Sequence, residues 1–264
     1  MYYHADIFEA VTAFLLGAVV GSFLNVVIIR LPEGRSIVHP PSTCPDCSHT
    51  INYYDNIPIL SFFILRGRCR ECGGRISLRY PVIEFISGFL CMALYLKFGP
   101  TMAFVVLLLF CSAMEAIFWI DLDHMIIPDV ISLNGIGVGI LAALAGLIPD
   151  LNWKLSLGGV VFGGAILYVP ALLYEKIRGL EGLGGGDIKL LAMIGAFTGP
   201  YGVVFVLFFS SLTGSIAALA GMLIRGTGST TPIPFGPFLS SAAIFYIFVG
   251  KEIIHRFYGM SNFF

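Results

Sequence analysis

The stretch TMAFVVLLLFCSAMEAIFWIDLDH, residues 101–124, decides the fold class of this chain, because it contains an apolar run long enough to cross a membrane. A helix that spans the hydrocarbon core of a bilayer needs about 20 mainly apolar residues. Residues 101–120 meet this requirement, and the acids Asp121 and Asp123 follow directly. The pattern predicts a membrane-spanning helix with carboxylates where the chain leaves the apolar layer.

The composition of the whole chain agrees with this prediction. Of the 264 residues, 57% are hydrophobic and 12% are charged, whereas soluble domains carry about 25% charged residues. The net charge of −1 excludes bulk attraction to nucleic acid as the main function. The first apolar run lacks a preceding basic segment and a small-residue cleavage site, so we expect no cleavable signal peptide.

The same length criterion predicts about eight transmembrane helices, so the expected fold is an all-α polytopic membrane protein. The sixth, DIKLLAMIGAFTG at 187–199, is too short to cross a core about 30 Å thick, and we expect a broken span that begins inside the membrane. The other predicted spans are 6–29, 81–98, 101–120, 129–148, 154–175, 201–224 and 235–255.

The positions of Lys and Arg predict the orientation, because these residues collect on the cytoplasmic side of membrane proteins. Placing the polar segment 30–80 in the cytoplasm leaves only four of the fifteen basic residues outside, and with eight spans both termini face away from the cytoplasm. Those four are Lys97, Lys154, Lys251 and Arg256.

The segment 30–80 is expected to be a small cytoplasmic domain that needs a cross-link to fold, because about 50 residues of this composition lack a sufficient core. It contains CPDC at 44–47 and CREC at 69–72, separated by 21 residues. Two such knuckles form a tetrahedral Zn²⁺ site, and the glycines that follow the second knuckle supply a permissive backbone. The predicted ligands are Cys44, Cys47, Cys69 and Cys72, followed by Gly73 and Gly74.

Other interpretations of the cysteines are a pair of disulfides, a redox CxxC motif or a nucleic-acid-binding ribbon. A cytoplasmic location disfavours stable disulfides, and the loop lacks the interleaved aromatic and basic residues of a nucleic-acid site. A closed site with four thiolates has no open coordination position, so we expect it to organise the loop without performing chemistry.

Two carboxylates are predicted to meet at the cytoplasmic face. Asp121 ends the third span, and Asp187 begins the sixth after a run of glycines, so the topology places both at one membrane depth. Acids in apolar segments are costly and call for a reason. Two neighbouring carboxyl groups share a proton, as in aspartic proteases. Gly184, Gly185 and Gly186 are expected to break the helix and let water and a substrate backbone approach.

Each acid also has a simpler interpretation. An aspartate at the end of a span is commonly a helix cap, and this applies to Asp121 and Asp187 singly and to Asp129 after Pro128. The charge-free TPIPFGPF at 231–238 contains three prolines and is predicted not to form regular helix, either as a re-entrant connector or as a wall of the cleft.

The chain resembles the type IV prepilin peptidases, also called prepilin leader peptidase/N-methyltransferases, over nearly its whole length. The motifs that carry the resemblance are GSFLNVVIIRLP at 21–32, the two CxxC pairs, RGRCRECGGRISLRYPVIE at 66–84, DLDHMIIPD at 121–129, GGGDIKLLAMIGAF at 184–197 and TPIPFGPFL at 231–239.

This resemblance implies a bifunctional enzyme of the bacterial inner membrane. Its catalytic aspartates correspond to Asp121 and Asp187, and it cleaves type IV prepilins or pseudopilins after a Gly at the cytoplasmic face. S-adenosylmethionine then donates a methyl group to the new N-terminus. The implied division is a first helix at 1–29, a zinc-binding domain associated with methyl transfer at 30–80 and a peptidase domain at 81–264.

Within the loop, the resemblance points to Gly67 as a position for methyl transfer, with Arg68 where relatives often have Lys. Glu84 is expected either to pair with nearby arginines or to belong to this second site. The basic residues are expected to contact either membrane lipid or the substrate leader, which are equally good partners. No nucleic acid is expected to bind. A transporter with an intramembrane acidic site and a membrane-anchored zinc-ribbon interaction module are the alternative functions.

Overall fold

The computed structural model describes residues 5–179, 184–225, 233–250 and 252–253. These residues form helices joined by loops, and they contain isolated β-bridges but no strand. The chain divides into two compact units, residues 1–112 and 113–264, with the boundary inside one helix. The prediction of an all-α protein is confirmed.

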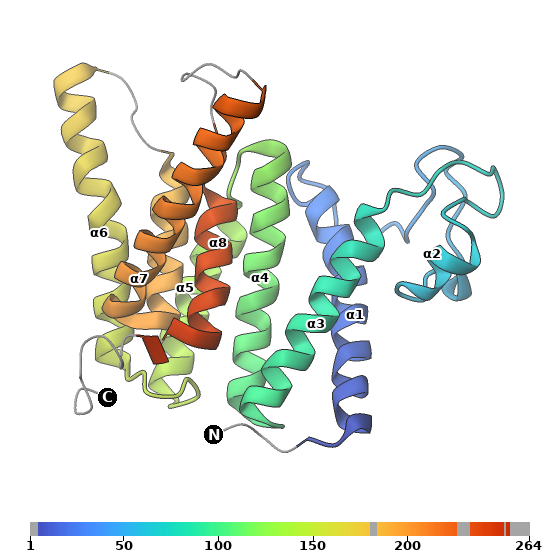
Figure 1. Ribbon diagram of the computed structural model, residues 1–264, viewed down its shortest axis with the longest axis horizontal. Coiled ribbons are helices and arrows are strands. Elements are labelled where there is room, and N and C mark those ends of the chain that lie inside the picture. The colour runs from blue at the N-terminus through green and yellow to red at the C-terminus, as the bar shows by residue number, and fades with distance from the viewer. Residues whose placement is uncertain (1–4, 180–183, 226–232, 251, 254–264) are drawn as a thin grey trace. The chain divides into compact units, whose positions relative to one another are not determined.

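The first unit is built on the pairing of α1 (Ile7–Arg30) with α3 (Arg79–Phe98), which Figure 1 shows crossing one another. Gly17 and Gly21 of α1 lie against α3, since a Cβ on Gly21 would come within 2.7 Å of the Ser87 hydroxyl oxygen and a Cβ on Gly17 would collide with Cys91. Small residues spaced by four allow two helix backbones to approach closely in an apolar medium.

The loop between α1 and α3 contains only two short helices, η1 (Tyr53–Asp55) and α2 (Leu60–Ile64). Arg30, at the end of α1, fastens the beginning of this loop because its guanidinium donates hydrogen bonds to the carbonyls of Ser36, Pro40 and Pro41 at 2.7–3.2 Å. The loop is therefore attached to the helix pair by polar contacts.

Among the described residues, the second unit contains the C-terminal part of α4 and the helices that follow it, which run side by side in Figure 1. The α7 helix is interrupted at Gly199, whose φ of 70° and ψ of −179° are not helical, and Pro200 follows. The sequence prediction of two helical segments with a break near residue 200 is confirmed. The bounds are α4 (Met102–His124), α5 (Asp129–Leu144), α6 (Trp153–Arg178), α7 (Gly185–Arg225) and α8 (Gly236–Phe245), with a π turn at Tyr246–Gly250.

Glycines bring α6 and α7 into backbone contact. A Cβ on Gly159 would collide with the carbonyl of Gly195, and a Cβ on Gly163 would lie 2.5 Å from the carbonyl oxygen of Leu191. The buried hydroxyl of Ser156 donates to the Ala196 carbonyl at 2.8 Å, which adds a hydrogen bond to this interface. The first segment of α7 is thus fixed against α6.

Five of the described helices are long and apolar enough to cross a membrane, namely α1, α3, α4, α6 and α7, while α5 and α8 are shorter. The prediction of 129–148 for the fourth span is too long, since α5 ends at Leu144. Gly146 adopts a φ of 67° and its N–H donates to the Ala143 carbonyl, which is how a left-handed glycine ends a helix.

The third predicted span is too short, because α4 continues to His124 and encloses Asp121. The prediction that TPIPFGPF is not regular helix is wrong for its last three residues, Gly236 to Phe238, which open α8. Pro237 stands in the first turn, where a missing N–H breaks no helical hydrogen bond. Thr231 and Pro232 lie outside the described residues.

Replacement of Gly159 by Ala is expected to destabilise the second unit, because the added methyl group would overlap the Gly195 carbonyl. Overpacking of this kind costs about 1–3 kcal/mol. Gly158→Ala is the matched control, since its Cβ would lie 3.5 Å from the nearest atom, in Pro200. Thermal unfolding in detergent should show a lower midpoint for the first variant only. Equal midpoints would show that α6 and α7 do not pack through Gly159.

Candidate functional site

Asp121 lies in the last turn of α4 and is buried, with 5% of its surface exposed. Its Oδ2 accepts a hydrogen bond of 2.9 Å from the backbone N–H of Gly236, the first residue of α8. Helix N-termini present unpaired N–H groups and a partial positive charge, which suit a carboxylate. Asp121 is therefore held by the start of a helix 115 residues further along the chain.

Asp187 occupies the first turn of α7, and its carboxylate interacts electrostatically with that of Asp121. Its backbone N–H donates to the Gly184 carbonyl at 3.1 Å, so Asp187 stands inside the helix. The interpretation of Asp187 as a helix N-cap is wrong, because the residue before the helix is Gly184. The two acids that the sequence analysis paired therefore lie close enough to influence one another electrostatically.

The first turn of α7 is tied to the first turn of α5 by an ion pair. Lys189 Nζ lies 2.7 Å from Asp129 Oδ1 and 2.8 Å from Oδ2. Gly186 packs beside it, since a Cβ there would lie 3.0 Å from the Cβ of Ile127. The side chain of Asp129 makes no cap hydrogen bond to α5, so the cap interpretation is also wrong for this acid.

The glycines before Asp187 differ in their surroundings. Gly185 opens α7, and no atom of the described residues would lie within 4 Å of a Cβ added to it, while a Cβ added to Gly184 would lie 3.6 Å from Asp187 Oδ2. None of Gly184, Gly185 and Gly186 has a positive φ, so these positions do not need glycine for backbone conformation. Gly185 instead leaves open space beside the helix, and Gly186 allows close packing against Ile127.

The four loop cysteines form a cluster whose Sγ atoms all lie within 4.8 Å of one another. Cys44 Sγ and Cys72 Sγ are 3.9 Å apart, and all four cysteines are free thiols. A tetrahedral zinc site with Zn–S bonds of about 2.3 Å requires sulfur atoms about 3.8 Å apart. The donor set and its spacing therefore fit one tetrahedral metal ion, and the disulfide interpretation is wrong.

The two CxxC knuckles have the same backbone design. In each, the residue four positions after the first cysteine has a positive φ, which is 59° at Ser48 and 71° at Gly73. Its N–H donates to the carbonyl of that cysteine at 2.9–3.0 Å. Gly74 donates to Cys72 Sγ at 3.4 Å, and a Cβ there would collide with Asp46. The predicted permissive backbone is confirmed at Gly73, whereas Gly74 has no positive φ and instead leaves room for the Asp46 side chain.

The two thiols of the second knuckle are affected in opposite directions. The Gly74 N–H lowers the pKa of Cys72, but desolvation and the neighbouring thiols outweigh it and raise this pKa to about 12. The backbone N–H groups of Cys72 and Glu71 lower the pKa of the Cys69 thiol to about 7, which favours the thiolate that binds metal. Arg70 makes a bidentate pair with Asp55 at 2.6–3.1 Å. This hydrogen bonding holds the pKa of Asp55 below its usual range and links the knuckle to η1.

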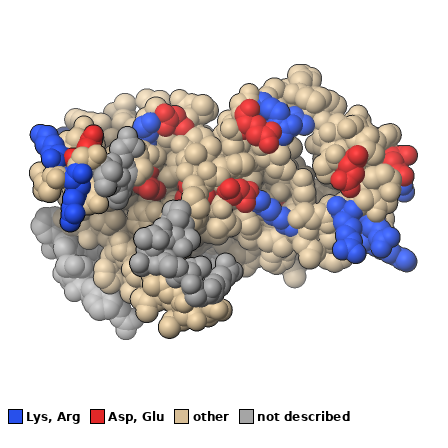
Figure 2. All heavy atoms as spheres, turned by 90° about the horizontal axis from the view of Figure 1, so that it is seen from above, with Lys and Arg blue, Asp and Glu red and all other residues tan. Residues whose placement is uncertain are grey.

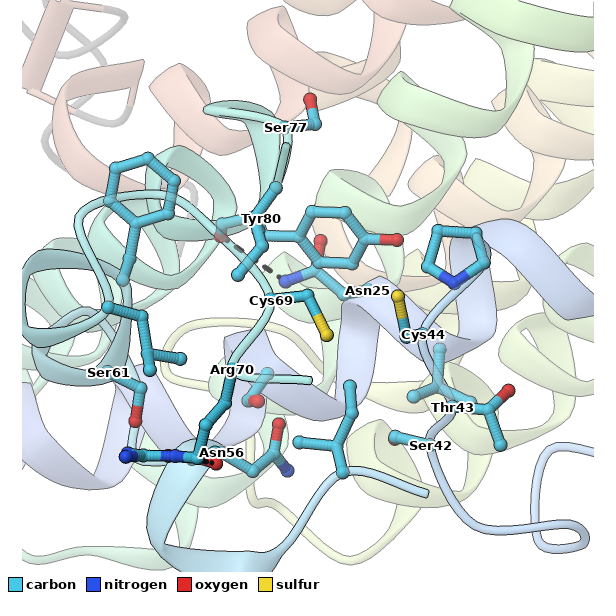
Figure 3. Close-up of a pocket in the computed structure, with 18 of the residues that line it drawn as sticks. Asn25, Ser42, Thr43, Cys44, Asn56, Ser61, Cys69, Arg70, Ser77 and Tyr80 are labelled. Carbon is cyan, nitrogen blue, oxygen red and sulfur yellow. Dashed lines mark hydrogen bonds and ion pairs between the residues drawn. The ribbon is translucent and has the colours of Figure 1, made fainter. Parts of the chain in front are cut away.

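A cavity of about 470 Å³ lies between the loop and the ends of α1 and α3 (Figure 3). Asn25, Ser61 and Glu84 line its buried side. Glu84 accepts a 2.7 Å hydrogen bond from the N–H of Ile59, whose φ is 62°, and another from the Ser22 hydroxyl. The expected pairing of Glu84 with arginine is therefore wrong, because its carboxylate fixes a strained loop backbone.

Gly67 lies behind the wall of this cavity. It has a φ of 67°, and a Cβ there would come within 3.0 Å of the Phe62 ring, which lines the cavity. Its N–H donates to the Phe62 carbonyl at 2.9 Å, and its carbonyl accepts from Ile76 at 2.8 Å. Gly67 thus shapes the cavity through Phe62, and its role in cofactor binding stays a prediction.

Sequence reasoning missed two residues that the structure places at these sites. Gly236 supplies the hydrogen bond to Asp121, and no local pattern links segments so far apart. Asn25 lines the cavity. A polar residue within an apolar helix was the available signal for Asn25.

Comparison with protein families gives two matches. Residues 15–98 match the bacterial peptidase A24 N-terminal domain, and residues 108–219 match the type IV leader peptidase family. No solved structure matches the chain.

Several proteins are similar to this chain over most of its length. A prepilin leader peptidase/N-methyltransferase of Pseudomonas aeruginosa is 36% identical, over 94% of this chain and 93% of its own. The protein of the same name from Aeromonas hydrophila is 36% identical over 95% and 93% of the two chains. That of Myxococcus xanthus is 41% identical over 82% of this chain and 64% of its own.

Proposed function

This chain belongs to the type IV leader peptidase family, and from this membership we infer that it cleaves prepilin leaders and methylates the new N-terminus. The relatives that match it over nearly their whole length carry both activities in their names. The single observation that best supports the protease activity is the buried Asp121 beside Asp187, fixed by a hydrogen bond from another helix.

In the proposed cleavage, Asp121 and Asp187 share one proton and act as a unit. One carboxylate takes a proton from a water molecule that attacks the scissile carbonyl, and the other gives its proton to the carbonyl oxygen. Gly236 N–H orients the Asp121 carboxylate, and the Lys189–Asp129 pair holds the turn that carries Asp187. The open space beside Gly185 lets the substrate backbone approach the acids.

The proposed substrates are type IV prepilins or type II secretion pseudoprepilins, cut after a Gly. We propose that the chain crosses the bacterial inner membrane eight times, with α5, α8 and the two segments of α7 counted as spans. The basic residues of the 30–80 loop support a cytoplasmic location for the loop and for the acids.

The loop is proposed to hold one structural Zn²⁺ on Cys44, Cys47, Cys69 and Cys72, and S-adenosylmethionine is proposed as the methyl donor. The spacing of the sulfur atoms supports the metal. We retain the functional division into a first helix at 1–29, a loop domain for methyl transfer at 30–80 and a peptidase domain at 81–264.

Membrane lipid is a proposed partner, and nucleic acid is not. On the face seen in Figure 2, Lys and Arg side chains are interspersed with Asp and Glu. This mixture supports the proposal, because a nucleic-acid site needs a basic stripe.

The alternatives of a transporter and of a zinc-ribbon module are less well supported. Both acids lie in terminal turns of helices, whereas a transport site lies near the membrane midplane.

Asp121→Asn and Asp187→Asn are each expected to lower cleavage of a membrane-embedded prepilin by about 10³-fold or more, because the two carboxyl groups act as one unit. Asp123→Asn, which alters an exposed acid of the same helix, should retain activity. Electrophoresis of the processed pilin measures the effect. Full activity in either of the first two variants would refute the aspartyl assignment.

Gly236→Ala is expected to lower kcat for cleavage by about 10²-fold, because the methyl group would lie 2.6 Å from Asp121 Oδ2 and displace the carboxylate. Gly214→Ala is the control, since its Cβ would be 3.5 Å from the nearest atom, in Phe238. The two kcat values are compared below the unfolding midpoint of each variant, because the overlap with Asp121 also lowers the midpoint of Gly236→Ala. A kcat for Gly236→Ala equal to that of the control would show that this contact does not position Asp121.

Purified protein is expected to contain one zinc ion, and Cys44→Ser and Cys72→Ser should lose it. Methylation should fail in these variants before cleavage does, because the metal organises the loop. Cys91→Ala removes a buried thiol that lies outside the cluster and should keep the metal. Elemental analysis and the mass of the pilin N-terminus provide the measurements. Equal loss of both activities would mean that the loop also supports the protease.

A further inference from the structure

We propose that the cavity between the loop and the ends of α1 and α3 binds S-adenosylmethionine. The inference rests on the proposed function, since a methyl transfer requires a site for the donor. The cavity of about 470 Å³ falls within the range of about 300–1,000 Å³ that small-molecule sites occupy. It lies in the first unit, where α1, α3 and both knuckles supply its walls.

The buried side of the cavity carries an acceptor without a donor. Asn25 is 6% exposed, and its amide nitrogen donates to the carbonyls of Gly21 and Tyr80 at 3.3 Å each. Among the described residues, no donor reaches its amide oxygen, although Asn25 lines the cavity. Figure 3 shows its amide beside the ring of Tyr80. This oxygen is not one of the fully buried, unpartnered side-chain atoms of the described residues, so it is accessible to a ligand that brings an N–H group.

The open rim of the cavity also carries polar side chains that are available to bind a ligand. Arg75, Asn52 and Asn56 line the cavity and are exposed, and none makes a side-chain hydrogen bond or ion pair within the described part of the chain. A guanidinium binds a carboxylate through two parallel hydrogen bonds. Arg75 therefore suits the carboxylate of the methionyl group, and the two amides suit the hydroxyl groups of a ribose.

Two aromatic rings complete the match with a nucleoside. Phe62 and Tyr80 both line the cavity, and aromatic faces bind purine bases by stacking. By contrast, Asp55 and Arg70 already satisfy one another, so they form part of the wall. Unpaired donors, the Asn25 amide oxygen and two aromatic rings in one cavity fit a nucleoside that carries a carboxylate and hydroxyl groups.

The placement also explains why the metal cluster matters for methyl transfer. Cys44 and Cys69 line the same cavity (Figure 3), so the metal site forms one of its walls. In the transfer, the lone pair of the new N-terminal amine forms a bond to the methyl carbon while the carbon–sulfur bond breaks. The bonding electrons stay on sulfur, giving a neutral thioether, and the methylated ammonium gives one proton to solvent.

Binding of the reaction product S-adenosylhomocysteine to the full-length protein in detergent tests the site without relying on turnover. Calorimetry should show binding about tenfold weaker for Arg75→Ala, which loses a charged hydrogen-bonding group. Arg68→Ala is the matched control, because Arg68 is bridged to Arg75 in the same knuckle but lies outside the cavity. Its affinity should stay within about twofold of the wild type. Asn25→Leu should weaken binding to a similar degree, and all three variants should cleave prepilin normally.

Wild-type affinity in both Arg75→Ala and Asn25→Leu would overturn the site while leaving the proposed methyltransferase activity in place. A higher KM for prepilin cleavage in Arg75→Ala, with unchanged product binding, would show that the leader peptide occupies the cavity and would also overturn it. A wild-type protein that neither binds the product nor methylates pilin would refute the methyltransferase half of the proposed function itself.

Discussion

A carboxylate within an apolar helix must find its hydrogen-bond donors inside the protein, because lipid offers none. This constraint accounts for the contacts that shape both units. Asp121 receives the first N–H of α8, and Glu84 receives the N–H of Ile59. In each case a buried acid determines where a distant segment of backbone must lie. The polar residues of this chain therefore specify its arrangement, while its apolar residues specify that it is helical and membrane-embedded.

Close approach of helix backbones is the second requirement. Transmembrane helices gain little free energy from burying apolar surface against one another, because lipid tails are equally apolar. Small residues at the contact therefore decide which helices associate. Gly17 and Gly21 serve α1 and α3, and Gly159 and Gly163 serve α6 and α7. The second contact has a functional consequence, because α7 carries Asp187 at its start. The position of that carboxylate depends on glycines of a neighbouring helix.

The loop between α1 and α3 solves a different problem. It contains only short helices and cannot bury a core, so the cysteine cluster, the Arg30 contacts and the Glu84 hydrogen bond take the place of one. The two knuckles share a positive φ at equivalent positions, and their four Sγ atoms lie within 4.8 Å of one another. A cavity lined by Asn25, Tyr80 and Arg75 is the product of this arrangement. Polar cross-links allow a segment without a hydrophobic core to build a defined pocket.

The sequence by itself determined the helical class, the break near Gly199 and the cysteine quartet, because each depends on local spacing or on side-chain chemistry. The pairing of Asp121 with Asp187 as a catalytic site stays a prediction. Helix ends were predicted less well: α4 runs past Asp121, α5 stops at a left-handed Gly146, and Pro237 opens a helix. Only the tertiary structure decided that Gly236 holds Asp121, that Glu84 holds Ile59 and that Asn25 faces a cavity. The first two contacts join residues far apart in the chain and use a backbone N–H as the donor. Every residue except proline carries this N–H, so the contacts leave no mark in the sequence.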